Sequence, residues 1–294
     1  MPLCSISELL KDASKRKYAL GTFVIADISL IKPTIEAAQE ENSPVIVGGH
    51  YDFLKSPIGV KIFTNVIKTH AENVDVPVVL HLDHGKSLQE ILNCIREGFN
   101  SVMFDAAGFP LEKNIELTKN MAKIVHATGI PIEAEINEIP VLEEASPTEV
   151  SDELMTRPEE AKRFVEKTKV DILGISVGQV HHFPKLIGGT HPIPKIGKLN
   201  FERIKAIKEA TDVALCLHGS SHTPDDQIKK AIQLGVSKIN WGTALATAFT
   251  DTIRKTLSDE PDIYMPNEVL EPSQSKVKEL VKGRIKVFGS NGKA

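Results

Sequence analysis

The chain has 294 residues, of which 41% are hydrophobic and 25% charged, and its formal net charge is −4 at pH 7. These proportions are typical of a soluble globular protein, and they argue against a nucleic-acid-binding protein, which would carry a basic field. The three cysteines have no Cys-x-x-Cys spacing, so neither a disulfide framework nor a cysteine-rich zinc site is expected. No apolar run reaches the roughly 18–20 residues of a membrane span and no signal-peptide core is present, so we expect a cytoplasmic protein that does not enter a membrane.

Short apolar runs alternate with amphipathic segments along the chain. The apolar runs predict eight strands, at 21–25, 44–47, 77–82, 101–104, 131–135, 171–177, 213–217 and 237–240. Helices are predicted between them, at 31–41, 88–97, 115–127, 158–167, 201–210 and 224–234. This alternation implies parallel strands joined by right-handed crossovers, and eight units favour a closed (β/α)8 TIM barrel over a doubly wound open sheet.

No linker, repeat or low-complexity tract divides the chain, so residues 1–294 are interpreted as a single domain. The stretch after Ser258 is rich in proline and charge and then becomes helical at 275–287. It predicts a C-terminal helical extension that packs on the barrel or on a partner subunit.

The third predicted strand leads into an unusual polar sequence. Residues 78–85 read Val-Val-Leu-His-Leu-Asp-His-Gly, so a buried strand ends in a carboxylate and an imidazole. Neighbouring strand residues point to opposite faces, so Asp83 and His84 can serve one centre only if the chain leaves the strand there, and Gly85 would permit that bend. The functional interpretation is an acid/base carboxylate beside a metal-binding imidazole, and the alternative is a solvated strand end.

Ionisable and small polar residues also follow the other predicted strands, at the face where TIM-barrel enzymes carry their active sites. They are Asp105 after the fourth strand, Glu133 and Glu135 in the fifth, Gly178, His181 and His182 after the sixth, His218, Gly219 and Ser221 after the seventh, and Asn240, Gly242 and Thr243 at the eighth. A single buried histidine is usually satisfied by hydrogen bonds, but here histidines from three strands converge. Three protein ligands leave a fourth position open, as a catalytic zinc ion requires.

Two of these strand ends have the composition of an anion site. Residues 218–221 precede the helix predicted near Pro224, and residues 238–243 precede a helix that starts near Ala244. Small residues at helix N-termini bind anions through backbone N–H groups and the helix dipole, and barrels commonly hold phosphate after strands seven and eight. The alternative is ordinary N-capping by Ser221, Thr223 and Thr243.

The motifs His81-Leu82-Asp83-His84-Gly85 and Leu217-His218-Gly219 occur here together. With further matching stretches at 35–46, 101–105, 114–115, 133–135, 158–162, 198–201, 238–240 and 288–290, they resemble the class II (metal-dependent) ketose-bisphosphate aldolases. That family includes the fructose- and tagatose-bisphosphate aldolases, and the resemblance runs nearly end to end.

The resemblance implies a lyase of carbohydrate metabolism that reversibly cleaves a ketose 1-phosphate or 1,6-bisphosphate to dihydroxyacetone phosphate and an aldehyde, through a zinc-stabilised enediolate. It implies one Zn²⁺ held by His84, His181 and His218, with Asp105 and Glu135 supporting the ligands or offering an alternate metal position. Asp83 would exchange the proton of the C4 hydroxyl. A loop carboxylate, Glu143 with Glu144 beside it, would move the C3 proton.

The same resemblance places the substrate phosphate against Gly178, Gly219, Ser221, Asn240, Gly242 and Thr243, with a monovalent cation near that phosphate as a further candidate. It also implies a homodimer or homotetramer whose ligand is a small phosphorylated sugar. The alternatives are another metal-dependent sugar-phosphate enzyme on the same scaffold, such as an epimerase, and a non-catalytic family subunit.

The chain departs from the family pattern where substrate would bind. His182 and His222 stand where the family has glycines, Val24 and Asp27 replace asparagines, and His50 replaces a serine, while the loop 137–141 lacks glycine. We therefore expect the metal chemistry to be kept and specificity to lie with His182, His222, His50 and Asp27. The predicted substrate is a ketose phosphate other than the common hexose bisphosphate.

Overall fold

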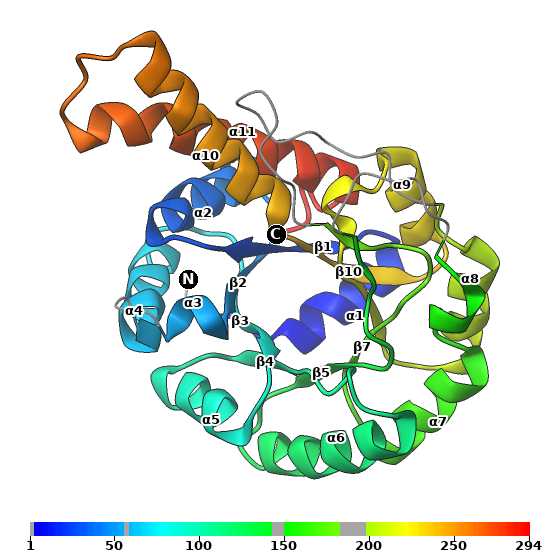
Figure 1. Ribbon diagram of the computed structural model, residues 1–294. Coiled ribbons are helices and arrows are strands. Elements are labelled where there is room, and N and C mark those ends of the chain that lie inside the picture. The colour runs from blue at the N-terminus through cyan, green and yellow to red at the C-terminus, as the bar shows by residue number, and fades with distance from the viewer. Residues whose placement is uncertain (1–2, 56–58, 143–149, 183–197) are drawn as a thin grey trace.

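The computed structural model describes residues 3–55, 59–142, 150–182 and 198–294, and the side chains of Leu142 and His182 fall outside the described part. Eight parallel strands close into a barrel in the order β1-β10-β9-β7-β5-β4-β3-β2 (Figure 1). Their bounds are β1 Leu20–Ile25, β2 Val45–His50, β3 Val78–Gly85, β4 Ser101–Phe104, β5 Ile132–Glu135, β7 Ile172–Gly174, β9 Ala214–Leu217 and β10 Val236–Trp241. The (β/α)8 barrel is confirmed, and the alternative of an open sheet is wrong.

Helices surround the barrel between its strands (Figure 1). They are α2 Ile31–Glu40, α3 Tyr51–Leu54, α4 Gly59–Ala71, α5 Leu88–Glu97, α6 Leu111–His126, α7 Pro158–Thr168, α8 Phe201–Ala210 and α9 Asp225–Gln233, with short 3-10 turns η1 Ile28–Leu30, η2 Asp152–Leu154 and η3 Ser220–His222. Helix α5 shows how the sequence sets these limits. The Ser87 side chain accepts the Glu90 N–H at its start, and Gly98 ends it at a φ of 105°.

An N-terminal helix that the sequence pattern did not predict, α1 (Ile6–Arg16), closes the amino-terminal end of the barrel. Its buried residues Ile6, Leu10 and Ala13 form one apolar cluster with inward-facing strand residues that include Leu20 and Cys216. This apolar plug fills the barrel interior at its amino-terminal end.

The C-terminal extension is a helical hairpin of α10 (Thr243–Asp259) and α11 (Pro266–Phe288) that projects beyond the ring of helices (Figure 1). Helix α11 starts nine residues before the predicted 275, because Pro266 occupies the first turn, where a proline is tolerated. Its later half packs against α2 and β1 of the same chain through Val277, Val281, Ile285 and Phe288.

Strand β3 does not end at Leu82, as predicted, but continues to Gly85. Its pairing with β4 shifts register between Leu82 and Gly85, and His84 adopts a φ of 49°, which is uncommon for a residue other than glycine. The bend is therefore at His84, and the prediction that Gly85 makes it is wrong. Gly85 is needed for a different reason, because a Cβ there would lie 2.9 Å from the Met103 carbonyl oxygen.

Two short strands, β6 (Val141–Leu142) and β8 (His181–His182), pair in parallel outside the barrel. The predicted sixth barrel strand is correspondingly shorter than 171–177, because the chain leaves the sheet after Gly174 and re-pairs at β8. The His181 N–H donates to the Pro140 carbonyl at 2.8 Å, which fixes His181 beside the end of the loop that follows β5.

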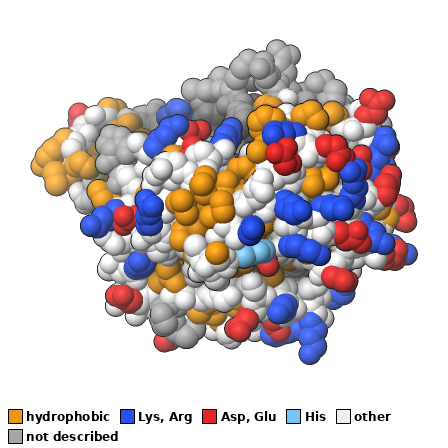
Figure 2. All heavy atoms as spheres, turned by 90° about the horizontal axis from the view of Figure 1, so that it is seen from below, with side chains coloured by type: hydrophobic (Ala, Val, Ile, Leu, Met, Phe, Trp, Pro, Cys, Tyr) orange, Lys and Arg blue, Asp and Glu red, His pale blue; other side chains and the backbone are white. Residues whose placement is uncertain are grey.

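The surface in Figure 2 carries Lys and Arg side chains interspersed with Asp and Glu and with small apolar areas, so that face has no field of one sign. Within the described ranges, no helix combines the length and apolar character needed to cross a membrane.

Phe288 ties the extension to the barrel: it is 1% exposed and stacks on Phe23 with ring centroids 6.5 Å apart. We expect Phe288→Ala to lower the free energy of unfolding by about 3–5 kcal/mol, because it leaves a cavity at this contact. Phe109→Ala is the matched control, since Phe109 is 53% exposed, and it should change stability by no more than about 0.5 kcal/mol. Denaturant unfolding of both variants measures this; equal effects would contradict the packing described.

Candidate active site

A cavity of about 430 Å³ opens at the carboxyl ends of the barrel strands. The predicted site residues that line it are His50, Asp83, His84, Asp105, His181, His218, Gly219, Ser221, Asn240, Gly242 and Thr243. Val24, Ala26, Lys86, Val141, Ala246 and Thr247 complete its wall. Most of the residues singled out from the sequence are therefore brought together.

Asp83 and His84 line the same cavity although they are consecutive. The bulge at His84 removes the alternation that would otherwise send one of them out of the barrel. The register shift therefore lets both side chains face the cavity.

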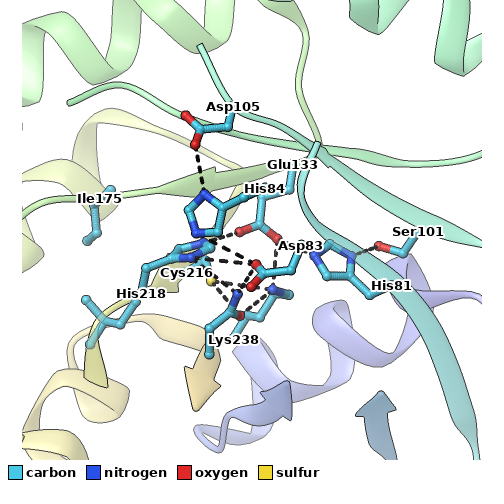
Figure 3. A network of polar contacts seen from close by, with 12 residues as sticks. His81, Asp83, His84, Ser101, Asp105, Glu133, Ile175, Cys216, His218 and Lys238 are labelled. Carbon is cyan, nitrogen blue, oxygen red and sulfur yellow. Dashed lines mark hydrogen bonds and ion pairs between the residues drawn. The ribbon is translucent and has the colours of Figure 1, made fainter. Parts of the chain in front are cut away.

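Two imidazoles are each held from behind by a carboxylate (Figure 3). His84 Nδ1 lies 2.9 Å from Asp105 Oδ2, and His218 Nε2 lies 2.7 Å from Glu133 Oε1. The other ring nitrogens, His84 Nε2 and His218 Nδ1, both lie 3.9 Å from Asp83 Oδ1. With ring centroids 4.9 Å apart, the two rings present one nitrogen each to a common space.

His181 lies at the edge of this space. Its ring centroid is 5.9 Å from that of His84. Burial, together with the positive charges of His218 and His84, lowers the pKa of His181 to about 4, so its imidazole is neutral at pH 7. Among the described residues, the clusters of potential ligands within 4.8 Å of one another are Asp83–His84–His218 and Glu133–Cys216–His218, and neither includes His181.

Asp83 is a buried carboxylate that is held ionised. It is 4% exposed and accepts a hydrogen bond from Asn240 Nδ2 at 2.9 Å. Burial alone would raise the pKa of Asp83, but the charges of His84 and His218 outweigh it and lower that pKa to about 2. The carboxylate is therefore ionised at pH 7.

The electrostatics of the cavity suit a cation. Burial would lower the pKa of His84, but the charge of Asp83, the hydrogen bond to Asp105 and the charge of Glu135 raise it to about 10. His84 is therefore protonated in the absence of a metal ion, and a bound cation would replace that proton. Glu135 has a buried oxygen, Oε2, without a hydrogen-bond partner, and burial raises its pKa to about 7. Imidazole nitrogens and spare carboxylate oxygens are the donors that zinc accepts, so the residues present fit such an ion.

A buried polar network beneath the site was not predicted (Figure 3). Lys238 Nζ lies 2.9 Å from Glu133 Oε2 and 3.6 Å from Cys216 Sγ, and His81 Nε2 lies 3.7 Å from Glu133 Oε2. Burial would raise the pKa of Glu133, but the Lys238 charge and the His218 hydrogen bond hold it well below its usual range.

The sequence carried a signal for this network. Residues two apart in a strand share a face, so an inward-facing Asn240 requires an inward-facing Lys238. The Lys238 ammonium group already places a positive charge beside Glu133 and Cys216, which disfavours a second metal ion among Glu133, Cys216 and His218.

The predicted anion site lies at the start of α10. Its N-cap, Gly242, provides no side-chain hydrogen bond, and the Ser221 hydroxyl reaches across from η3 to accept the Ala244 N–H at 3.4 Å. The capping alternative is thus partly correct, but Ser221 caps α10 and not the helix after Pro224. The two predicted anion loops meet on one wall of the cavity.

Several predicted residues lie elsewhere. Four of them do not line the cavity: Asp27, Glu135, Gly178 and His222. Asp27 caps η1 by accepting from the Ser29 N–H, and Glu135 lies in β5. Gly178 adopts a φ of 111° against the Lys198 carbonyl, and His222 is buried in η3. Glu143 and Glu144 and the His182 side chain lie outside the described residues, as does the segment 183–197.

A closed (β/α)8 barrel with ionisable groups gathered at the carboxyl ends of its strands defines a TIM-barrel enzyme. Comparison with known families agrees: residues 4–293 match the family model described as fructose-bisphosphate aldolase class-II. The chain belongs to this family and is a class II aldolase, a carbon–carbon lyase.

Individual relatives are similar over their whole lengths. A fructose-bisphosphate aldolase from Geobacillus stearothermophilus is 36% identical over 296 residues, covering 100% of this chain and 99% of the relative. A 6-phospho-5-dehydro-2-deoxy-D-gluconate aldolase from Bacillus subtilis is also 36% identical, covering 100% and 98%. The crystal structure of the YdjI aldolase from Escherichia coli K12 superposes with a TM-score of 0.82 at 33% identity, covering 99% of both chains.

Proposed function

We propose that this chain is a zinc-dependent aldolase that reversibly cleaves a ketose 1-phosphate or 1,6-bisphosphate to dihydroxyacetone phosphate and an aldehyde. The observation that carries the proposal is the pair of imidazoles, each bonded to a carboxylate behind it and turned toward Asp83. A carboxylate behind a histidine fixes the ring and increases its basicity toward a metal.

His84 through Nε2 and His218 through Nδ1 would hold the ion, with His181 as the third ligand. When bound, zinc supplies a Lewis acid for the ketone oxygen and stabilises the negative charge that develops as the carbon–carbon bond breaks. The neutral imidazole of His181 and its ring, 5.9 Å from that of His84, support its assignment in preference to His182.

Asp83 would take the proton of the C4 hydroxyl, because it is ionised, nearly buried and beside the ligand nitrogens. The opposite proton transfer, at C3, is assigned to Glu143. That residue follows β6 directly in the chain, and β6 pairs with the strand that carries His181. Val141 in β6, two residues before Glu143 in the chain, lines the wall of the cavity.

The phosphate on C1 would bind at Gly219, Ser221 and the start of α10, where backbone N–H groups and the helix dipole favour an anion. Asn240, Gly242 and Thr243 line the same wall. A monovalent cation near this phosphate remains part of the proposal. Gly178 would contribute indirectly, because it permits the close approach of the Lys198 carbonyl.

We propose a substrate other than fructose 1,6-bisphosphate. Val24 and His50 line the cavity at positions where the family is expected to have Asn and Ser, so the cavity lacks the amide and the hydroxyl of those residues. That curated relatives of equal identity are named for two different substrates agrees with a scaffold whose specificity varies.

The proposed state is a homodimer or homotetramer in the cytoplasm. The tip of the α10–α11 hairpin supports self-association, since Leu257, Tyr264 and Met265 are 45%, 85% and 42% exposed. Arg284 is already paired with Asp225 of its own chain at 2.6 Å, so it is not assigned to a neighbouring subunit. Light scattering of the purified protein gives the subunit count.

Zinc dependence is testable directly. Elemental analysis should find one zinc per chain, exhaustive chelation should abolish cleavage, and added zinc should restore it. His84→Ala should weaken zinc binding more than the about 10- to 100-fold expected for loss of an outer hydrogen-bonding partner. His70→Ala, in α4 and outside the cavity wall, is the control that should retain both zinc and activity. Undiminished cleavage after complete removal of zinc would refute the proposal.

Asp83→Asn separates metal binding from proton transfer. We expect it to lower kcat about 100- to 10 000-fold, because the amide cannot accept the hydroxyl proton, while the zinc content stays at the wild-type level. Steady-state kinetics and metal analysis on the same preparation measure the two effects. An Asp83→Asn variant with near-normal kcat would remove Asp83 from the reaction.

A panel of ketose 1-phosphates and bisphosphates tests the specificity. We expect the highest kcat/KM for a substrate other than fructose 1,6-bisphosphate, because Val24 and His50 line the cavity in place of the family's Asn and Ser. A strong preference for fructose 1,6-bisphosphate would show that these substitutions leave substrate choice unchanged.

A further inference from the structure

Lys238 is fully buried inside the barrel, directly beneath the cavity. Its ammonium group contacts three neighbours: Asn240 Oδ1 at 2.6 Å, Glu133 Oε2 at 2.9 Å and Cys216 Sγ at 3.6 Å. Burying an ammonium group is costly unless it is well paired, and an apolar side chain would fill the barrel interior without that cost. The position of Lys238 therefore requires a reason beyond packing.

One branch from Lys238 leads to His218. Glu133 receives the Lys238 ammonium group at one carboxylate oxygen and the His218 Nε2–H at the other, 2.7 Å away. Because a carboxylate only accepts hydrogen bonds, this contact places the ring proton on Nε2. Nδ1, on the side of the cavity, is left as an acceptor, and Asn240 Nδ2 lies 3.3 Å from it. The positive charge of Lys238 stabilises the ionised form of Glu133, and only that form can accept the His218 hydrogen bond while fixing the ring in this way.

The other branch leads to Asp83. A lysine ammonium group can only donate, so the Asn240 atom that faces it must be the amide oxygen. The amide NH2 is then turned the other way, and it donates to Asp83 Oδ1 at 2.9 Å. Lys238 thereby sets the orientation of an amide that could otherwise present either end.

We propose that Lys238 is a positioning residue that organises both halves of the site from below, holding His218 through Glu133 and Asp83 through Asn240. It touches neither substrate nor metal, and the proposal rests on the proposed zinc function because its effect is transmitted to a metal ligand. If Lys238 had only a structural role, its replacement would lower the stability of the barrel and leave the zinc affinity unchanged.

The test measures zinc affinity by competition with a chelating dye in wild type, Lys238→Met, Glu133→Gln and the double variant, with zinc itself as the probe. Thr34→Val is the matched control, because it removes an equally buried hydrogen bond, from the Thr34 hydroxyl to the Leu30 carbonyl in α2, away from Lys238, Glu133 and His218. Thermal unfolding of the metal-free proteins checks that each variant is folded.

We expect Lys238→Met and Glu133→Gln each to weaken zinc binding about 10- to 100-fold, with Thr34→Val unchanged. The double variant should match Glu133→Gln, because both changes act on one path to His218. At saturating zinc, Lys238→Met should still have a kcat lower than that of Glu133→Gln, by up to about 100-fold, since Asn240 has also lost its fixed orientation.

Each outcome decides the matter. Wild-type zinc affinity in Lys238→Met overturns the positioning role, whatever Glu133→Gln shows, and leaves the aldolase proposal standing; equal weakening by Thr34→Val does the same. A wild-type protein that binds no zinc overturns both proposals. If Lys238→Met does not fold, Lys238→Gln, which removes the charge but keeps a polar side chain, is measured in its place.

Discussion

The site depends on pairs of carboxylate and imidazole groups that fix two histidine rings in complementary orientations. Asp105 holds His84 by Nδ1 and Glu133 holds His218 by Nε2, so opposite ring nitrogens face one space beside Asp83. A histidine free to rotate would offer either nitrogen, and a divalent ion would have to supply the energy of ordering it. Here the surrounding barrel has already fixed the rings.

The fold supplies this arrangement through three constraints. The apolar cluster of α1 and inward-facing strand residues fills one end of the barrel. The bulge at His84 lets two consecutive residues face inward, at the cost of a left-handed backbone conformation of a kind that proteins retain mainly at functional sites. The buried Lys238 balances the charge of Glu133, without which a carboxylate could not remain ionised at that depth.

The sequence predicted the eight barrel strands and the strand ends that meet at the cavity, because buried parallel strands are continuous apolar runs and the carboxyl ends of barrel strands share one face. It did not predict the bulge at His84, since the backbone conformation there is set by pairing with β4 and is not encoded by a glycine. Helix α1 escaped prediction because a helix that plugs a barrel is not part of the strand–helix alternation. Lys238 was predicted only as part of the strand 237–240 and of the possible phosphate-binding stretch 238–243, although its spacing from Asn240 places it on the same, inward face.

X-ray absorption spectroscopy at the zinc edge of the purified, zinc-loaded protein tests the central claim most directly. The account predicts a shell of nitrogen and oxygen atoms with the scattering pattern of three imidazoles. A sulfur atom in that shell would mean that Cys216 binds the metal in place of a histidine, and a shell without imidazole scattering would show that the converging rings hold no metal. Either result would contradict the arrangement of His84, His181 and His218 on which the proposed chemistry depends.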